Sequence, residues 1–322
     1  MNSDSKVFVA GHRGLAGSAI VRRLRAGGYS NVILRAHSEL DLTKQEEVRV
    51  FFESERPEYV FLAAGKVGGI LANSTYRADF VYQNIAIQSN VIHEAYKVGV
   101  KKLLALGSSC IYPRDCPQPI REEYLLTAPL EHSNRPYAIA KIAAIEMCWS
   151  YNCQYGTRFS CAMPTNLYGP GDNYDLETSH VLPALIRKFH EAKIRGQKRV
   201  TVWGSGLPRR EFLYSDDMAD ACIFLVSAPD AVTSPLFSDS HPPLVNVGCG
   251  EDLSIRDLAD SISKLVGGDA ELTFDPSKPD GTPRKLLDVS VLSKFGWRPK
   301  VPLQRGLRLA YEDFLASAAT SP

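Results

Sequence analysis

The sequence lacks an apolar run near the roughly 20 residues that a membrane-spanning helix needs, and it lacks an excess of charge of either sign. Its 37 lysines and arginines nearly balance its 36 aspartates and glutamates, so no overall positive field would attract a nucleic acid or an anionic membrane. The first five residues are polar and lack the basic and apolar regions of a secretion signal. We therefore expect a cytoplasmic protein with neither a nucleic-acid nor a membrane partner.

The seven cysteines are scattered and odd in number, without the close paired spacing of a zinc site or a secreted disulfide framework. This spacing indicates a reducing compartment and no metal site. The chain does have 44% apolar residues over 322 positions, which is enough for a large core. Its length suggests two domains, or one α/β domain with a large appendage.

Strand-like and helix-like segments alternate along the first half of the chain. The strand-like segments are continuous apolar runs, which are typical of parallel strands buried on both faces. Strand and helix alternation implies right-handed crossovers, so we predict an α/β fold, a Rossmann-type doubly wound parallel sheet. The predicted strands are 6–10, 31–34, 59–64, 102–106 and 159–163, and the predicted helices are 15–26, one opened by a capping box of Thr43 and Glu46, 84–98 and 137–155.

Beyond Gly169 the chain changes character, because prolines and glycines divide it into shorter pieces. We predict an NADP-binding Rossmann domain over residues 1–168 and a smaller C-terminal α/β substrate lobe that takes most of residues 169–322. Segments around 212–248 are expected to return to the first domain. Helices of the second part are predicted at 181–195, 254–266 and 303–315.

Three glycines lie at Gly-x-x-Gly-x-x-Gly spacing between the first predicted strand and the first predicted helix. Glycine permits a tight turn and a close backbone approach, and the free N–H groups at the helix N-terminus suit a pyrophosphate. Glycines alone would also fit a simple tight turn, but the strand, turn and helix context favours a dinucleotide site. The predicted loop consists of Gly11, His12, Arg13, Gly14, Leu15, Ala16 and Gly17.

Two arginines bear on which dinucleotide binds. The second predicted strand ends in Arg35, where NAD-binding folds usually carry an acidic residue for the ribose 2′-hydroxyl. Arg13 lies inside the glycine loop, and both guanidinium groups are placed to meet a 2′-phosphate, which they match in charge and geometry. The alternative is that both are solvated loop residues. The pattern favours NADPH, or NADP+ in the reverse direction, as the cofactor.

A serine follows the fourth predicted strand, and a tyrosine and a lysine lie four apart on a later predicted helix. At this spacing Tyr137 and Lys141 share one helix face, so the ammonium group could lower the pKa of the phenol and hold a nicotinamide ribose. Tyr137 could exchange a proton with a carbonyl oxygen, and Ser108 could donate a second hydrogen bond to that oxygen. The spacing alone would fit a surface pair, but the preceding glycine loop and serine favour a reductase site.

Several motifs together resemble the extended short-chain dehydrogenase/reductase family. They are Gly11 to Gly17, Asp41-Leu42, Ala63-Ala64-Gly65, Ser108, Tyr137, Lys141 and the string 164–170. Further strings, at 65–73, 107–113, 180–183, 202–206, 209–214 and 278–285, are similar to those of family members that act on the GDP-linked ketosugar GDP-4-keto-6-deoxy-D-mannose. These motifs span almost the whole chain.

The resemblance implies a role for individual residues. Ser108, Tyr137 and Lys141 match the reductase triad, whereas Cys110 and His180 match a pair that exchanges protons at the sugar carbons. Cofactor contacts are implied for Gly11 to Gly17, Asp41, Leu106, Gly107, Ser108, Ser109, Lys141, Pro164, Thr165, Asn166, Leu167 and His180. Substrate contacts are implied for Lys188, Trp203, Arg210 and Asp280, with Lys188 standing where some members have arginine. The family also implies a homodimer formed through the helices around 85–98 and 137–155.

The function implied is an NADPH-dependent bifunctional 3,5-epimerase and 4-reductase that converts GDP-4-keto-6-deoxy-D-mannose to GDP-L-fucose. One alternative is a nucleotide-sugar 4-epimerase or 4,6-dehydratase that retains NAD. Arg13 and Arg35 argue against it, and dehydratases usually carry acidic residues where this chain has Ser109 and Cys110. A second alternative is a non-catalytic NADP-sensing regulator, whose members tend to lose the tyrosine or the lysine.

Overall fold

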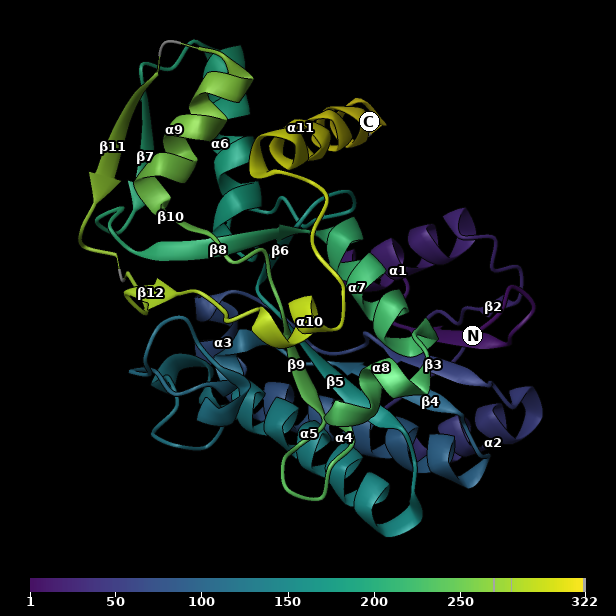
Figure 1. Ribbon diagram of the computed structural model, residues 1–322. Coiled ribbons are helices and arrows are strands. Elements are labelled where there is room, and N and C mark those ends of the chain that lie inside the picture. The colour runs from purple at the N-terminus through teal and green to yellow at the C-terminus, as the bar shows by residue number, and fades with distance from the viewer. Residues whose placement is uncertain (269, 279, 321–322) are drawn as a thin grey trace.

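A six-stranded parallel sheet forms the centre of the larger part of the molecule (Figure 1). The structure is a computed structural model that describes residues 1–268, 270–278 and 280–320. The strand order is β2-β1-β3-β4-β5-β9, with every neighbouring pair parallel, which confirms the predicted doubly wound α/β fold. The strands are β1 (Val7–Ala10), β2 (Val32–Ile33), β3 (Tyr59–Leu62), β4 (Lys102–Leu106), β5 (Phe159–Pro164) and β9 (Leu244–Val247).

Helices cover both faces of this sheet, so successive residues of a strand enter different cores. Phe8 packs with helices α2, α4 and α5, whereas Val7 and Val9 pack with α1 and α7 on the opposite face. This two-sided burial explains why the strands read as continuous apolar runs. The helices are α1 (Leu15–Ala26), α2 (Gln45–Glu55), α4 (Arg77–Lys97), α5 (Arg135–Tyr155) and α7 (Ser215–Ser227), with the shorter α3 (Ile70–Thr75), α8 (Asp230–Thr233) and α10 (Ser290–Lys294).

The starts of α4 and α2 differ from the sequence-based prediction in ways that have a physical reason. Helix α4 begins at Arg77 rather than near residue 84, because buried Phe80 extends its apolar face one turn earlier. The capping box predicted for α2 is wrong: no side chain caps that helix. The Thr43 hydroxyl instead donates to the Asp41 carboxylate at 2.7 Å, and Glu46 pairs with Arg49. A closer acceptor therefore takes the hydroxyl, and α2 starts later.

A second, smaller group of elements lies above the carboxyl ends of the sheet (Figure 1). Strand β8 pairs with β6, β10 and β12, while β7 and β11 form a separate parallel pair. Three helices pack with these strands around a third apolar core. The elements are β6 (Asn166–Tyr168), β7 (Arg199–Trp203), β8 (Arg209–Tyr214), β10 (Asp252–Ser254), β11 (Glu271–Asp275), β12 (Arg284–Lys285), α6 (Val181–Arg195), α9 (Ile255–Val266) and α11 (Leu303–Thr320).

The chain crosses between the two groups more than once. After β8 it continues into α7, which packs against α1, and then into β9, which extends the large sheet beyond β5. Arg22 and Arg23 of α1 form ion pairs of 2.6 Å with Asp216 and Asp220 of α7. We propose the division into residues 1–168 and 169–322 with the return near 212–248 on this basis; residues 269, 279, 321 and 322 lie outside the description.

The cysteines and the long helices bear on the expected environment of the chain. All seven cysteines are free thiols. Among residues 1–268, 270–278 and 280–320, no helix combines the length and the apolar character that crossing a bilayer requires.

A buried carboxylate joins the two groups of elements. Glu211 of β8 is fully buried, and its carboxylate accepts hydrogen bonds from the backbone N–H groups of Cys249, Gly250 and Leu287 at 2.6, 2.7 and 3.0 Å. These donors lie after β9 and after β12, so one side chain holds three separate segments together. Because β8 and β12 both contribute to the cavity described below, Glu211 also fixes the position of that wall.

Removing the Glu211 carboxylate should therefore destabilise the fold. We expect Glu211→Ala to lower the free energy of unfolding by about 2 kcal/mol or more, because three buried backbone donors lose a charged acceptor. Denaturant unfolding measures this change. The neighbouring Glu251→Ala variant removes an exposed carboxylate and is the control; equal stability of the two variants would contradict the role given to Glu211.

Candidate active site

A cavity of about 750 Å³ lies at the carboxyl ends of β4 and β5, between the large sheet and the smaller group of elements. Ligands of open α/β sheets bind in this position, because loops leave the strands there. Many of the predicted site residues line it although they are far apart in the sequence. They are Ser108, Ser109, Cys110, Tyr137, Asn166, Leu167, His180, Lys188, Trp203, Arg210 and Asp280.

The predicted serine, tyrosine and lysine come from two adjacent elements. Ser108 lies two residues after the end of β4 and precedes a short 3₁₀ turn, Ser109–Ile111. Tyr137 and Lys141 lie one turn apart on α5. The ammonium group of Lys141 is buried; it donates to the Leu106 carbonyl oxygen at 2.7 Å and lies 5.7 Å from the centre of the Tyr137 ring. Burial lowers the pKa of Lys141 to about 8.

The expected effect of Lys141 on the phenol is absent from this structure. Burial raises the pKa of Tyr137, and the nearby Cys110 adds to that increase. Lys141 does not offset the increase because its ammonium group points to the Leu106 carbonyl group rather than to the phenol oxygen. The neutral phenol is the form that can donate a proton, so the site remains suited to general acid chemistry.

The other two predicted catalytic residues also face the cavity. Cys110 is 6% exposed, and its backbone N–H donates to the Ser108 hydroxyl oxygen at 3.4 Å. His180 is the residue before α6, and its side chain does not cap that helix. Its ring is open to the cavity, yet the surrounding protein lowers its pKa through desolvation. A thiol and an imidazole from different elements thus line one cavity, and each can exchange a proton with a molecule bound there.

The predicted substrate residues line the cavity from α6, β7 and β8 and, for Asp280, from the loop between β11 and β12. Trp203 is 54% exposed, and the ammonium groups of Lys188 and Lys278 each lie 5.4 Å from its ring centre. The Asp280 carboxylate accepts hydrogen bonds from the backbone N–H and hydroxyl group of Ser205 at 2.7 and 2.8 Å. Asp280 therefore shapes the turn after Trp203, and a direct substrate contact is a further role that we propose for it.

The glycine loop fits the pyrophosphate of a dinucleotide. Gly11 has a φ of +84°, and a Cβ atom there would lie 2.6 Å from the Ala64 nitrogen, while a Cβ atom at Gly17 would clash with the Gly11 carbonyl group. Helix α1 has no side-chain cap and no acidic residue in its first turn, so its N-terminal N–H groups are free for an anion. The buried His12 Nδ1 atom also has no hydrogen-bond partner among the described residues.

The two arginines from which NADPH binding was predicted have different surroundings in the structure. Arg35 is already engaged: it pairs with Glu55 of α2 at 2.5 Å and lies over the Phe51 ring. Arg13 is exposed and has no ion pair or hydrogen bond within the part of the chain that the structure describes. Asp41 is likewise engaged, since its carboxylate accepts two hydrogen bonds from Thr43. Arg13 is thus the better placed of the two guanidinium groups for a 2′-phosphate.

We therefore expect Arg13 to carry most of the discrimination between the two nicotinamide cofactors. Arg13→Ala should weaken NADPH binding on the order of tenfold and change NADH binding little, because a charge-assisted contact to the 2′-phosphate contributes roughly 1.5 to 3 kcal/mol. Arg35→Ala should have a smaller effect, since Glu55 already pairs with it. Fluorescence titration with each cofactor measures both variants; equal losses for NADPH and NADH would remove the argument from Arg13.

Lys285 is a cavity residue that the sequence-based selection missed. It lines the same cavity as Cys110, and it lies within the string 278–285 that carried part of the family resemblance. Its chemistry has no spacing motif, so only the resemblance could have drawn attention to it.

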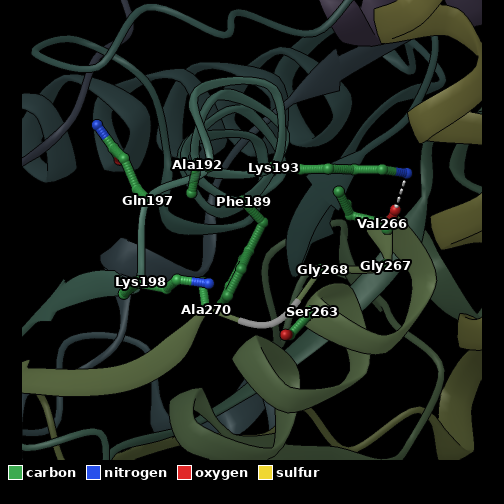
Figure 2. A pocket seen from close by; sticks show the side chains of 11 residues that line it. Phe189, Ala192, Lys193, Gln197, Lys198, Ser263, Val266, Gly267, Gly268 and Ala270 are labelled. Carbon is green, nitrogen blue, oxygen red and sulfur yellow. Dashed lines mark hydrogen bonds between the residues drawn. The ribbon is translucent and has the colours of Figure 1, made fainter.

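A second hollow of about 260 Å³ lies between the C-terminal ends of α6 and α9 (Figure 2). Lys193 reaches across it and donates to the Val266 carbonyl oxygen at 2.7 Å. None of the predicted site residues lines this hollow. The larger cavity is therefore the candidate active site.

Comparison with known proteins defines the class to which this fold and site belong. The model of the family described as NAD dependent epimerase/dehydratase matches residues 7–248, and the chain belongs to this family, which uses a nicotinamide cofactor. GDP-L-fucose synthase 1 from Arabidopsis thaliana is 55% identical over 314 residues, covering 98% of this chain and 94% of that protein. GDP-L-fucose synthase from Escherichia coli (strain K12) is 52% identical over 317 residues, 97% of each chain.

A solved structure shows the same likeness in three dimensions. The structure of a GDP-L-fucose synthetase from Naegleria fowleri bound to NADP is 28% identical, with a TM-score of 0.88. The match covers 100% of this chain and 96% of that one. The agreement therefore extends over both the large sheet and the smaller group of elements.

Proposed function

We propose that this chain is an NADPH-dependent enzyme that converts GDP-4-keto-6-deoxy-D-mannose to GDP-L-fucose. The reaction inverts C3 and C5 of the sugar and then reduces the C4 ketone. GDP-L-fucose synthases that are more than 50% identical over nearly the full chain, from Arabidopsis thaliana and Escherichia coli among others, support this function. The NADP-bound neighbour supports NADPH as the nicotinamide cofactor.

The observation that carries the proposal is that one cavity is lined by Cys110 and His180 as well as by Ser108 and Tyr137. Reduction of a ketone needs a proton donor and a second hydrogen bond to the oxygen, which Tyr137 and Ser108 can supply. Inversion at a carbon needs a base on one face and an acid on the other. The thiol and the imidazole provide this second pair.

The C4 ketone has two uses in this scheme. It first makes the neighbouring C3 and C5 protons acidic, so Cys110 can remove them while Ser108 and Tyr137 stabilise the negative oxygen. His180 then returns a proton to the opposite face. NADPH held at the glycine loop would supply the hydride for C4, and Tyr137 donates the proton to the resulting oxygen.

Four cationic side chains line the cavity and favour a substrate with a diphosphate. They are Lys188, Arg210, Lys278 and Lys285. Arg210 can bind a phosphate through two N–H groups, whereas the lysines act as point charges. The half-exposed ring of Trp203, beside the ammonium groups of Lys188 and Lys278, offers an apolar surface to a sugar or a base.

We also propose that the protein is a cytoplasmic homodimer that pairs through α4 and α5. These two helices pack against each other, and both present large apolar side chains to solvent. Those side chains are Tyr82, Ile85, Ile139 and Tyr155. Pairing would remove this apolar surface from water.

Incubation of purified protein with NADPH and GDP-4-keto-6-deoxy-D-mannose tests the function. NADPH oxidation, followed by its near-ultraviolet absorbance, should depend on the ketosugar, and NMR should identify the product as GDP-L-fucose. The reaction without sugar is the control. An NAD-retaining epimerase would leave NADPH unoxidised, and a non-catalytic regulator would bind NADPH without turnover; either result would contradict the proposal.

A further inference from the structure

Lys285 is a cation without a partner inside the active-site cavity. It lies on β12, whose parallel register with β8 places it opposite Arg210. The side chain is half-buried, and its ammonium group has no ion pair or hydrogen bond within residues 1–268, 270–278 and 280–320. Enclosing a charge without a partner costs free energy, so the position calls for an electrostatic role.

Of the groups around Lys285, one can be stabilised by its positive charge in the proposed reaction. The side chains with the strongest electrostatic influence on it are Cys110, Arg210, Glu131 and Cys116. Glu131 already faces Arg114 at 3.4 Å, and Arg210 repels a second cation. Cys116 does not line the cavity. Cys110 does, and it is the group that the proposed reaction requires as a base.

Cys110 needs a cation because its surroundings oppose ionisation. Burial raises the pKa of the Cys110 thiol, and Lys285 is the leading influence that lowers it, ahead of Ser108 and Lys141. Tyr137 also lines the cavity with Cys110, but its phenol is neutral and adds no positive charge. A nearby opposite charge typically changes a pKa by about 1 to 3.

We infer that Lys285 is a positioning residue whose ammonium group stabilises Cys110 as a thiolate, ready to take a proton from C3 or C5 of the sugar. In that step an S–H bond forms and a C–H bond breaks. The electron pair of the C–H bond moves toward the C4 oxygen, so the step needs neither an oxidant nor a reductant. The inference rests on the proposed function for its substrate, but the pairing of Lys285 with Cys110 can be tested in the free protein.

Alkylation of the free protein tests the pairing without using the reaction. Iodoacetamide modifies thiolates, and Cys110 is the one cysteine in the tryptic peptide 103–114, so mass spectrometry can follow it alone. We expect Lys285→Met to slow alkylation of Cys110 about tenfold at neutral pH and to move the midpoint of its pH profile upward by about one pH unit. Lys285→Arg should restore most of the rate.

Two controls distinguish a specific effect of Lys285 on Cys110 from a general effect of the substitution on the protein. Lys278→Met removes another lysine that lines the same cavity, and it should leave the Cys110 profile unchanged. The exposed Cys153 should react equally in every variant, and NADPH titration shows that each variant is folded. An unchanged Cys110 profile in folded Lys285→Met would overturn the inference, even if turnover fell through weaker binding of the diphosphate. Failure of the proposed function would appear separately, as absence of ketosugar turnover in the unmodified protein.

Discussion

Cys110→Ala should stop the entry of solvent deuterium into C3 and C5 of the ketosugar. Cys110 is the base in the proposed reaction, and among the described residues that line the cavity there is no other thiol. We expect the exchange rate to fall by at least about 10², the lower end of what a positioned base contributes. NMR of sugar recovered after incubation in deuterium oxide measures this rate.

Two further variants are compared with Cys110→Ala to interpret its exchange rate. Cys116→Ala removes a nearby thiol that does not line the cavity, and it should leave exchange intact. His180→Asn should still allow deuterium to enter on the original face through Cys110, whereas inversion should fail because the opposite donor is missing. Undiminished exchange in Cys110→Ala would place the base elsewhere, and normal inversion in His180→Asn would reduce that residue to a bystander.

Tyr137→Phe should lose most C4 reduction while keeping the fold and NADPH binding. The substitution deletes only the phenolic oxygen, and the ring retains its edge contact with Phe80 at 6.1 Å between centroids. A general acid contributes about 10² to 10⁴ in rate, so NADPH oxidation with the ketosugar should slow by that factor. Stopped-flow or steady-state absorbance measurements give the rate of NADPH oxidation directly.

Tyr151→Phe is the matched control for this variant. Tyr151 lies on the same helix, but its hydroxyl contacts His93 at 2.8 Å, outside the cavity. It should therefore reduce the ketosugar at the parent rate. A parental rate in Tyr137→Phe as well would show that the proton for C4 comes from another group.

The fold could be predicted because the sequence patterns that indicate it lie within short segments of the chain. Each strand of the large sheet is a short apolar run, and the first glycine loop lies between a strand and a helix, so periodicity and spacing were sufficient. The ends of elements were less predictable, since the start of α4 depends on where Phe80 is buried. Burial is a property of the assembled core rather than of the local sequence.

The site could be predicted only in part because its charges depend on long-range neighbours. Nothing near Arg35 indicates that Glu55, twenty residues later on α2, neutralises it. Lys285 lines the same cavity as Cys110 because β12 pairs with β8, which no spacing motif encodes. Motifs therefore predicted which groups perform chemistry, whereas the groups that tune them follow from tertiary structure.

The return of β9 to the large sheet has a consequence for any attempt to isolate the cofactor-binding part. A fragment that ends at residue 168 would lack β9, so the backbone of β5 would become an open sheet edge available to other chains. It would also lack α7 and expose the apolar face of α1. Such a fragment should aggregate when expressed alone, and a separately supplied piece that carries α7 and β9 should keep it in solution.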